Sequence, residues 1–183
     1  QNNVGGATNL VRAMQAADIQ RLVFSSTAAI FGNPVSGLID EAHSKTPINV
    51  YGQTKLVVEQ MLEAVTASSD FSATCLRYFN AAGANNAANL GEWHEPETHL
   101  IPNALRAAAG TGNPLTLFGD DYPTPDGTCI RDYIHVDDLA SAHVAAIDAM
   151  TESGVFGTYN LGSGNGYSVK EVIAACQRAV GSE

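Results

Sequence analysis

Apolar residues recur every three or four positions in several segments of the chain. In residues 4–17 the apolar set comprises Val4, Leu10, Val11 and Met14, among many alanines. Such spacing places apolar side chains on one face of a helix. This pattern, with Asp137 as an N-cap before the fourth helix, predicts helices over residues 4–17, 50–66, 99–110, 138–150 and 169–180.

Short apolar runs separate these helices. The runs predict buried strands over residues 21–25, 72–78, 115–118, 133–136 and 156–161. Segments rich in Gly, Pro, Asn and Asp predict loops over residues 32–47, 81–98 and 119–128. The alternation of strand and helix predicts an α/β fold in which helices cover a parallel sheet.

Composition and charge narrow the function class. The 183 residues include 9 basic and 19 acidic side chains, for a net charge of −10, with 45% hydrophobic content. That length suits one domain, or one domain and part of another. An acidic surface repels phosphate backbones, so we expect no nucleic-acid partner, although a nucleotide ligand stays possible where backbone N–H groups converge. No apolar run reaches the roughly 18 residues of a membrane span, so no membrane partner is expected.

The cysteines, histidines and chain ends add three expectations. Cys75, Cys129 and Cys176 form no CxxC pair, which favours a reducing, cytoplasmic location. No HxxxH pair occurs, so we expect no metal site; the histidines are His43, His94, His99, His135 and His143. The chain starts without methionine and both ends interrupt helical pattern, so we interpret it as a piece of a longer protein.

Tyr51 and Lys55 are the first candidates for chemistry. Residues four apart share one face of a helix, and an ammonium beside a phenol favours the phenolate. A tyrosine in that setting can serve as a general base. The alternative is an exposed pair without function.

Three hydroxyl residues, Ser25, Ser26 and Thr27, end the first predicted strand. The carboxyl ends of parallel strands border the crevice where open α/β sheets bind ligands. A hydroxyl there can hold or relay the proton of a substrate alcohol. The alternative is that these residues only terminate the strand.

Several motifs resemble the extended short-chain dehydrogenase/reductase family. They are FSSTAAIFG at 24–32, YGQTK at 51–55 and RYFN at 77–80. A longer run, FGDDYPTPDGTCIRDYIHV at 118–136, is similar to the nucleotide-sugar epimerases of that family. The resemblance extends from residue 2 to the end of the chain.

This resemblance implies a role for individual residues. The catalytic residues would be Tyr51 as base, Lys55 as its helper, and Thr27, which shares the 4-hydroxyl of the sugar. The residues binding NAD would be Asn2, Ser25, Ser26, Tyr51, Lys55 and Phe79. The residues binding the UDP-sugar would be Thr27, Asn80, His99, Leu100, Thr116, Leu117, Phe118 and Arg131. Arg131 suits a diphosphate because a guanidinium pairs with two oxygens at once. The alternative role for Arg131 is a salt bridge with a neighbouring acid such as Asp132.

Two departures from the family refine the expectation. Related dehydratases carry an Asp-Glu pair after the Thr, whereas this chain has Ala28 and Ala29, which can donate no proton. Epimerisation is therefore favoured over elimination of water. The family's G-x-x-G-x-x-G cofactor loop does not occur in the sequence. The glycine-rich residues 162–166 lack its spacing, and we interpret them as a turn.

The resemblance implies a Rossmann-like doubly wound parallel sheet, incomplete here, with a smaller substrate-binding domain. Residues 1–80 would form the second half of the NAD-binding domain. Residues 81–183 would be mainly substrate-binding, with 129–150 packing back on the Rossmann part. The expected activity is NAD-dependent inversion of C4 of a UDP-hexose through a 4-keto sugar, by a full-length homodimer. Alternatives are an epimerase acting on UDP-glucuronate, a UDP-pentose or a UDP-N-acetylhexosamine, or a fragment that binds sugar nucleotides without catalysis.

Overall fold

The computed structural model describes residues 2–34 and 37–182. The chain forms two compact units, and each consists of two separate stretches of sequence. The first unit covers residues 1–79 and 138–162, and the second covers 80–137 and 163–183, as far as these are described. Among the described residues, no helix is both long and apolar enough to span a membrane.

A three-stranded parallel sheet forms the centre of the first unit. Its strands are β1 (Arg21–Thr27), β2 (Ser72–Tyr78) and β5 (Phe156–Leu161), in the order β1-β2-β5. Arg21 pairs with Ser72 and Thr27 with Tyr78, so β1 and β2 end side by side. The prediction of an α/β fold with a parallel sheet is confirmed.

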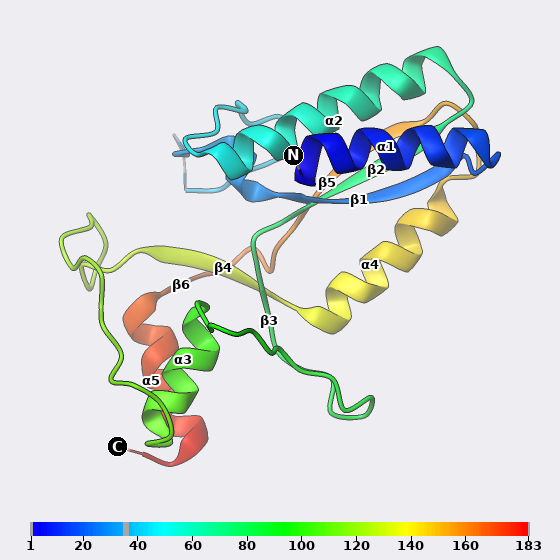
Figure 1. The fold of residues 1–183 in the computed structure, drawn as a ribbon. Helices are drawn as coiled ribbons and strands as arrows, with labels where there is room; N and C mark the ends of the chain where they lie inside the picture. The colour runs from blue at the N-terminus through cyan, green and yellow to red at the C-terminus, as the bar shows by residue number, and fades with distance from the viewer. Residues whose placement is uncertain (1, 35–36, 183) are drawn as a thin grey trace. The chain divides into compact units, whose positions relative to one another are not determined.

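Helices α1 (Asn2–Ala16) and α2 (Val50–Ser68) lie together on one face of this sheet (Figure 1). Their apolar stripes bury Val11, Val58 and Leu62 against Ala73 and Cys75 of β2. A short 3-10 helix, η1 (Ala28–Phe31), follows β1 directly and packs against α2. The sequence pattern gave no sign of η1, because a single turn is too short to show a period.

The second unit contains a smaller sheet and two packed helices. Strands β3 (Asn80–Ala82), β4 (Ile130–His135) and β6 (Gly166–Ser168) pair in the order β3-β4-β6, with β6 antiparallel. Helices α3 (Leu100–Ala108) and α5 (Val169–Val180) bury Ala104 against Val172 and Cys176. Helix α5 begins with a capping box, in which the Ser168 side chain accepts from the Glu171 N–H and Glu171 accepts from the Ser168 N–H.

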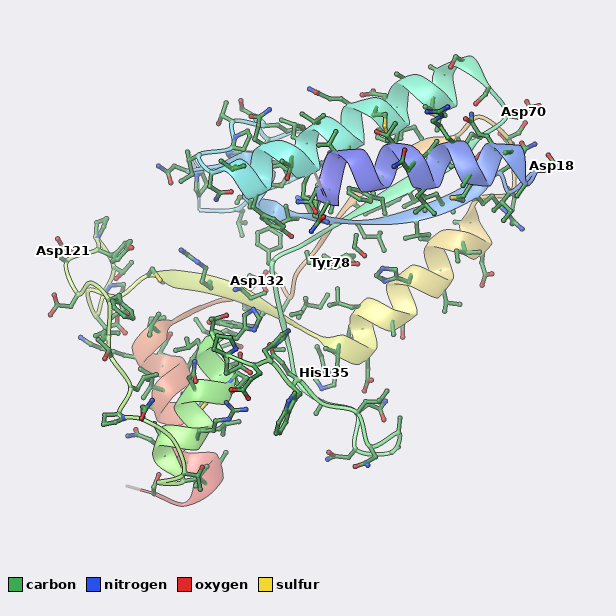
Figure 2. All side chains as sticks on the ribbon, in the orientation of Figure 1. Asp18, Asp70, Tyr78, Asp121, Asp132 and His135 are labelled. Atoms are coloured by element: carbon green, nitrogen blue, oxygen red, sulfur yellow. The ribbon has the colours of Figure 1, made fainter. Side chains whose placement is uncertain are left out.

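Two sequence predictions are wrong. Residues 115–118 form no strand, because Leu115 packs against α3 and α5 while Leu117 and Phe118 stay exposed without a ladder partner. Helix α4 (Val136–Ala149) begins directly after β4, so Asp137 lies in its first turn and is not an N-cap. The Asp137 N–H instead donates to His135 Nδ1 at 3.2 Å, and Figure 2 shows His135 where β4 passes into α4.

Candidate active site

Hydroxyl groups cluster at the carboxyl ends of β1 and β2 in the first unit. The Tyr78 hydroxyl donates a hydrogen bond to Ser25 Oγ at 2.7 Å. Figure 2 labels Tyr78, which projects from the last position of β2. Open α/β sheets bind ligands at this end of their strands. The structure therefore brings polar side chains together where the sequence predicted a site.

Lys55 connects α2 to the end of β1. Its Nζ donates to the backbone carbonyl of Ser25 at 2.8 Å. The same Nζ lies 5.7 Å from the centre of the Tyr51 ring and 4.8 Å from that of Phe24. Burial lowers the pKa of Lys55. An ammonium that is partly shielded from water acts more strongly on a neighbouring group than an exposed one.

Tyr51 stands in the first turn of α2, where the N-cap fixes the helix start. The Asn49 side chain accepts a hydrogen bond from the Gly52 N–H at 2.8 Å. Tyr51 is 51% exposed, so its phenol faces solvent and not the core. Lys55, one turn later, holds this face of the helix at the strand end. Lys55 is thus anchored, whereas the Tyr51 ring stays open to solvent.

Gly52 allows the helix to approach η1 closely. A Cβ at this position would lie 2.5 Å from the Ala29 carbonyl oxygen and 2.9 Å from its carbon. Both are backbone atoms, so they cannot move aside as a flexible side chain would. The glycine between Tyr51 and Gln53 is therefore required for the start of α2 to sit against η1.

Thr27 and Ser26 point to opposite faces of β1, as successive residues of a strand do. Thr27 Oγ1 accepts from the Ala29 N–H at 3.1 Å and caps η1. Its hydroxyl proton has no acceptor among the described residues, so it is available to a ligand. Ser26 is buried and donates to Glu59 Oε1 at 2.5 Å. Any contact of Ser26 with a cofactor would therefore come from its backbone.

Tyr78 and His143 belong to the same polar cluster, although the sequence motifs did not single them out. The Tyr78 hydroxyl lies 2.7 Å from His143 Nε2, and His143 Nδ1 lies 2.7 Å from the Leu139 carbonyl. Because a carbonyl only accepts, Nδ1 carries a proton.

Burial raises the pKa of Tyr78, its hydrogen bond with Ser25 opposes this rise, and the charge of Tyr51 adds to it. Tyr78 could have been found from its place at a strand end, whereas His143 is 65 positions away and gave no local signal.

The remaining predicted cofactor residues are Asn2, at the start of α1, and Phe79, directly after β2. Asn2 is the exposed first residue of α1. Its neighbour Asn3 donates from Nδ2 to Thr54 Oγ1 at 2.9 Å and so ties α1 to α2. The Phe79 N–H donates to the Leu161 carbonyl at 3.1 Å, which fixes the backbone just beyond β2.

In the second unit, Arg131 is exposed on β4 and donates from Nη1 to its neighbouring Ile130 carbonyl at 2.9 Å. The alternative of a salt bridge with Asp132 is not observed. Asp132 instead accepts from the N–H groups of Ser163 and Gly164 at 2.8 and 2.9 Å. The glycine-rich segment is thus a turn, as predicted, and its amides already bind a carboxylate.

The other predicted substrate residues occupy separate places in the second unit. Asn80 begins β3, His99 is the N-cap of α3, and Leu100 is the first residue of that helix. Thr116, Leu117 and Phe118 lie on the exposed segment after α3. Trp93 is exposed, and the Arg106 guanidinium lies 6.0 Å from its ring centre. No hydrogen bond between described residues joins this set to one another.

Comparison with known proteins finds a matching family, similar curated proteins and similar solved structures. Residues 1–162 match the family described as NAD dependent epimerase/dehydratase family. A curated relative, the UDP-glucose 4-epimerase of Halalkalibacterium halodurans, is 48% identical over 181 residues, which are 99% of this chain and 54% of that protein. The chain spans about half the length of the curated relatives it matches.

Solved structures agree with this result. The UDP-glucose 4-epimerase of Brucella ovis in complex with NAD is 48% identical with a TM-score of 0.91, over 97% of this chain and 55% of that one. The UDP-glucose 4-epimerase of Bifidobacterium longum in complex with NAD+ and UDP is 42% identical with a TM-score of 0.92, over 99% of this chain and 55% of that one.

Proposed function

The chain belongs to the NAD dependent epimerase/dehydratase family, and from this premise we propose that the full-length protein inverts C4 of a UDP-hexose. The proposed reaction interconverts UDP-glucose and UDP-galactose through a transient 4-keto sugar. The observation that carries this proposal is the convergence of Tyr51, Lys55 and Ser25 at the end of β1. The activity of the relatives described above supports it.

The donor set at the strand ends fits a nicotinamide cofactor. Lys55 uses one of its three N–H donors on the Ser25 carbonyl, so two remain for the hydroxyls of a ribose. Lys55 and Tyr51 would hold the nicotinamide ribose, and Asn2, Ser25, Ser26 and Phe79 would border the remainder of the nicotinamide half. NAD held by these residues would supply reversible hydride transfer at C4 of the sugar.

The residues of this chain would move the proton of the 4-hydroxyl. Tyr51 would take that proton as a phenolate, favoured by the Lys55 ammonium on the same helix face. Thr27 would share the hydrogen bond, because its own proton is uncommitted and its oxygen is fixed by the Ala29 N–H. Tyr51 would return the proton to O4 once the sugar has turned its other face. Ala28 and Ala29, which follow Thr27, could not protonate a leaving hydroxyl, so elimination is disfavoured.

The second unit would bind the UDP part of the substrate. Arg131 is exposed and makes no ion pair with any described residue, so its guanidinium is available for diphosphate oxygens. Contacts with the nucleotide and sugar would come from Asn80, His99, Leu100, Thr116, Leu117 and Phe118. In this proposal the first unit is the NAD-binding half-domain and the second is mainly substrate-binding. The full-length protein would be a homodimer, and its free thiols suit the cytoplasm.

Replacing Tyr51 by Phe in the full-length protein tests the assignment. The variant keeps the ring but cannot accept a proton, so kcat with UDP-galactose should fall at least about 100-fold. Tyr159→Phe is the matched control, because Tyr159 is exposed on β5 outside the proposed site. Full epimerase activity of Tyr51→Phe would refute the proposal.

Turnover on a panel of sugar nucleotides separates the rival substrates. Preference for UDP-glucose and UDP-galactose supports the proposed reaction. Preference for UDP-glucuronate, a UDP-pentose or a UDP-N-acetylhexosamine would keep the chemistry of Tyr51 but change the substrate. Binding of UDP-sugars without turnover of any of them would point to a binding protein.

A further inference from the structure

Two carboxylates and two imidazoles converge on the segment that precedes α3. They belong to Glu92, His94, Glu97 and His99, and one ligand-type atom from each lies within 4.8 Å of all the others. His99 Nδ1 approaches Glu92 Oε1 at 2.5 Å and Glu97 Oε1 at 3.3 Å. His94 Nδ1 lies 3.3 Å from Glu92 Oε1 and 3.8 Å from Glu97 Oε1. All four residues belong to the second unit, within eight positions of sequence.

These spacings resemble the edges of a metal coordination tetrahedron. Zinc binds imidazole nitrogen and carboxylate oxygen at about 2.0–2.2 Å, which separates neighbouring ligand atoms by roughly 3.3–3.6 Å. Two of the four nitrogen–oxygen distances are 3.3 Å and a third is 3.8 Å. Small side-chain rotations are therefore enough to centre an ion. His94 and His99 are 51% and 58% exposed, so an ion could reach the cluster from solvent.

The burial of the Glu97 carboxylate also favours a bound cation, independently of the distances between the ligand atoms. Its side chain is only 2% exposed. Oε1 accepts from the N–H groups of Thr98 and His99 at 2.9 and 3.0 Å. The other oxygen, Oε2, is buried without a hydrogen-bond partner in the described structure. A buried carboxylate oxygen without a partner is costly unless a cation completes it.

The charge of the two carboxylates also favours a cation at this place. Within the described ranges, the only ion pairs of Glu92 and Glu97 are with the two histidines. Arg106 is nearby in sequence, but its guanidinium lies over the Trp93 ring. A metal ion held between the two carboxylates and the two imidazoles would offset the negative charge of Glu92 and Glu97.

We propose that Glu92, His94, Glu97 and His99 bind a divalent transition-metal ion. Mixed imidazole and carboxylate ligands favour Zn²⁺ over Mg²⁺ or Ca²⁺, which prefer oxygen alone. The ion would fix the segment 92–99 where it enters α3, whose N-cap residue His99 makes no side-chain cap of its own. His99 would use Nδ1 for the ion, which leaves Nε2 for the UDP-sugar contact proposed above. The expectation of no metal site relied on the missing HxxxH pair, whereas the pattern here is Glu-x-His-x-x-Glu-x-His.

A Zn²⁺ titration of the 183-residue chain tests the site. The protein is prepared without a polyhistidine tag, freed of metal with a chelator, and titrated in competition with a chromophoric chelator. We expect one equivalent to bind with a Kd of about 10 µM or tighter. His94→Gln and Glu92→Gln should each weaken binding at least about tenfold. His135→Gln is the matched control, because exposed His135 lies 3.6 Å from Asp137 in a single His–carboxylate pair outside the cluster; it should leave the affinity unchanged.

Hydrogen exchange of the wild-type chain provides a readout that does not depend on any variant folding. Zn²⁺ should slow exchange of the amides of residues 92–105 and leave those near Cys129 unchanged. Co²⁺ in its place should give the visible absorption of a tetrahedral nitrogen–oxygen site. A folded wild type that binds no Zn²⁺ in this range, or protection that appears elsewhere, would mean that the four residues form hydrogen-bonded pairs only, and the proposal would be wrong.

Discussion

Arg77 is fully buried in the first unit, where a charge is tolerated only when it is paired. Glu59 accepts from it twice, with Nε–Oε1 at 3.1 Å and Nη2–Oε2 at 2.7 Å. Ser26 donates to the same carboxylate from β1. The pair thus joins α2, β1 and β2 beneath the strand ends. The ion pair contacts Ser26, which lies between Ser25 and Thr27 on β1. It therefore supports the strand end that carries the proposed site.

Glu59→Gln should lower the free energy of unfolding by roughly 3–5 kcal/mol, because it leaves the Arg77 charge buried without a counter-ion. Urea denaturation of the chain measures this change. Glu63→Gln is the control, since Glu63 is exposed on the same helix and its loss should change stability by less than about 0.5 kcal/mol. Equal shifts of the two midpoints would show that the ion pair does not stabilise the fold.

The three thiols should differ in reactivity. Burial raises the pKa of Cys75 strongly, with a further rise from the Glu59 charge, and burial also raises the pKa of Cys176. Because the thiolate is the reactive form, Cys129 should react first with a disulfide reagent at pH 8. Cys129→Ser should remove that fast phase, and urea should make the other two react. Fast labelling of Cys75 in the folded chain would contradict its burial.

At the scale of elements, the pattern of apolar residues predicted the bounds of longer helices and strands but missed the short ones. It predicted β2, β5 and α5 with their observed bounds, and each of the three contributes at least one apolar residue to a core cluster or its margin. It missed β3 and β6, which have three residues each and exist only because β4 pairs with both. The strand predicted at residues 115–118 is wrong for the same physical reason. An apolar run becomes a strand only where a neighbouring strand is available to pair with it.

Gly52→Ala tests the close contact between α2 and η1. An alanine normally stabilises a helix by about 0.5–1 kcal/mol relative to glycine. At position 52 the new Cβ would meet the Ala29 carbonyl at 2.5 Å, so we expect a net loss of about 1–3 kcal/mol. The kcat of the full-length protein for the proposed reaction should fall as well, because Tyr51 and Lys55 would move with the start of α2.

Gly5→Ala provides the matched control for this substitution. Gly5 lies inside α1, and a Cβ there would meet nothing within 4 Å. The chain should therefore become more stable, and thermal unfolding of both variants shows the contrast. A stabilised Gly52→Ala variant would mean that the approach of α2 to η1 can relax without cost.

At the scale of the whole molecule, the units are made of segments that are distant in sequence. Residues 138–162 complete the first unit after 58 residues of the second, those from 80 to 137. The sequence motifs singled out Tyr51, Lys55 and Thr27 as candidates because each lies within a short run of a strand or helix. They could not locate the Tyr78–His143 contact or the Asp132 contact with Gly164, since both depend on long-range packing. Site residues fixed by tertiary contacts therefore need the structure, whereas those fixed by local position do not.

The two units have different hydrophobic clusters, so we expect a core substitution to destabilise its own unit and not the other. Leu62 is buried in a cluster drawn from the first unit, and Val172 in one drawn from the second. Leu62→Ala should remove roughly 2–5 kcal/mol from the first core. Its effect should be confined to that unit, because no residue of its cluster belongs to α3 or α5. Hydrogen exchange should then show faster exchange in β1, β2 and β5 and unchanged exchange in α3 and α5, with the reverse for Val172→Ala. Equal loss of protection in both units for either variant would show that the chain unfolds as one cooperative body, in which the cores stabilise each other.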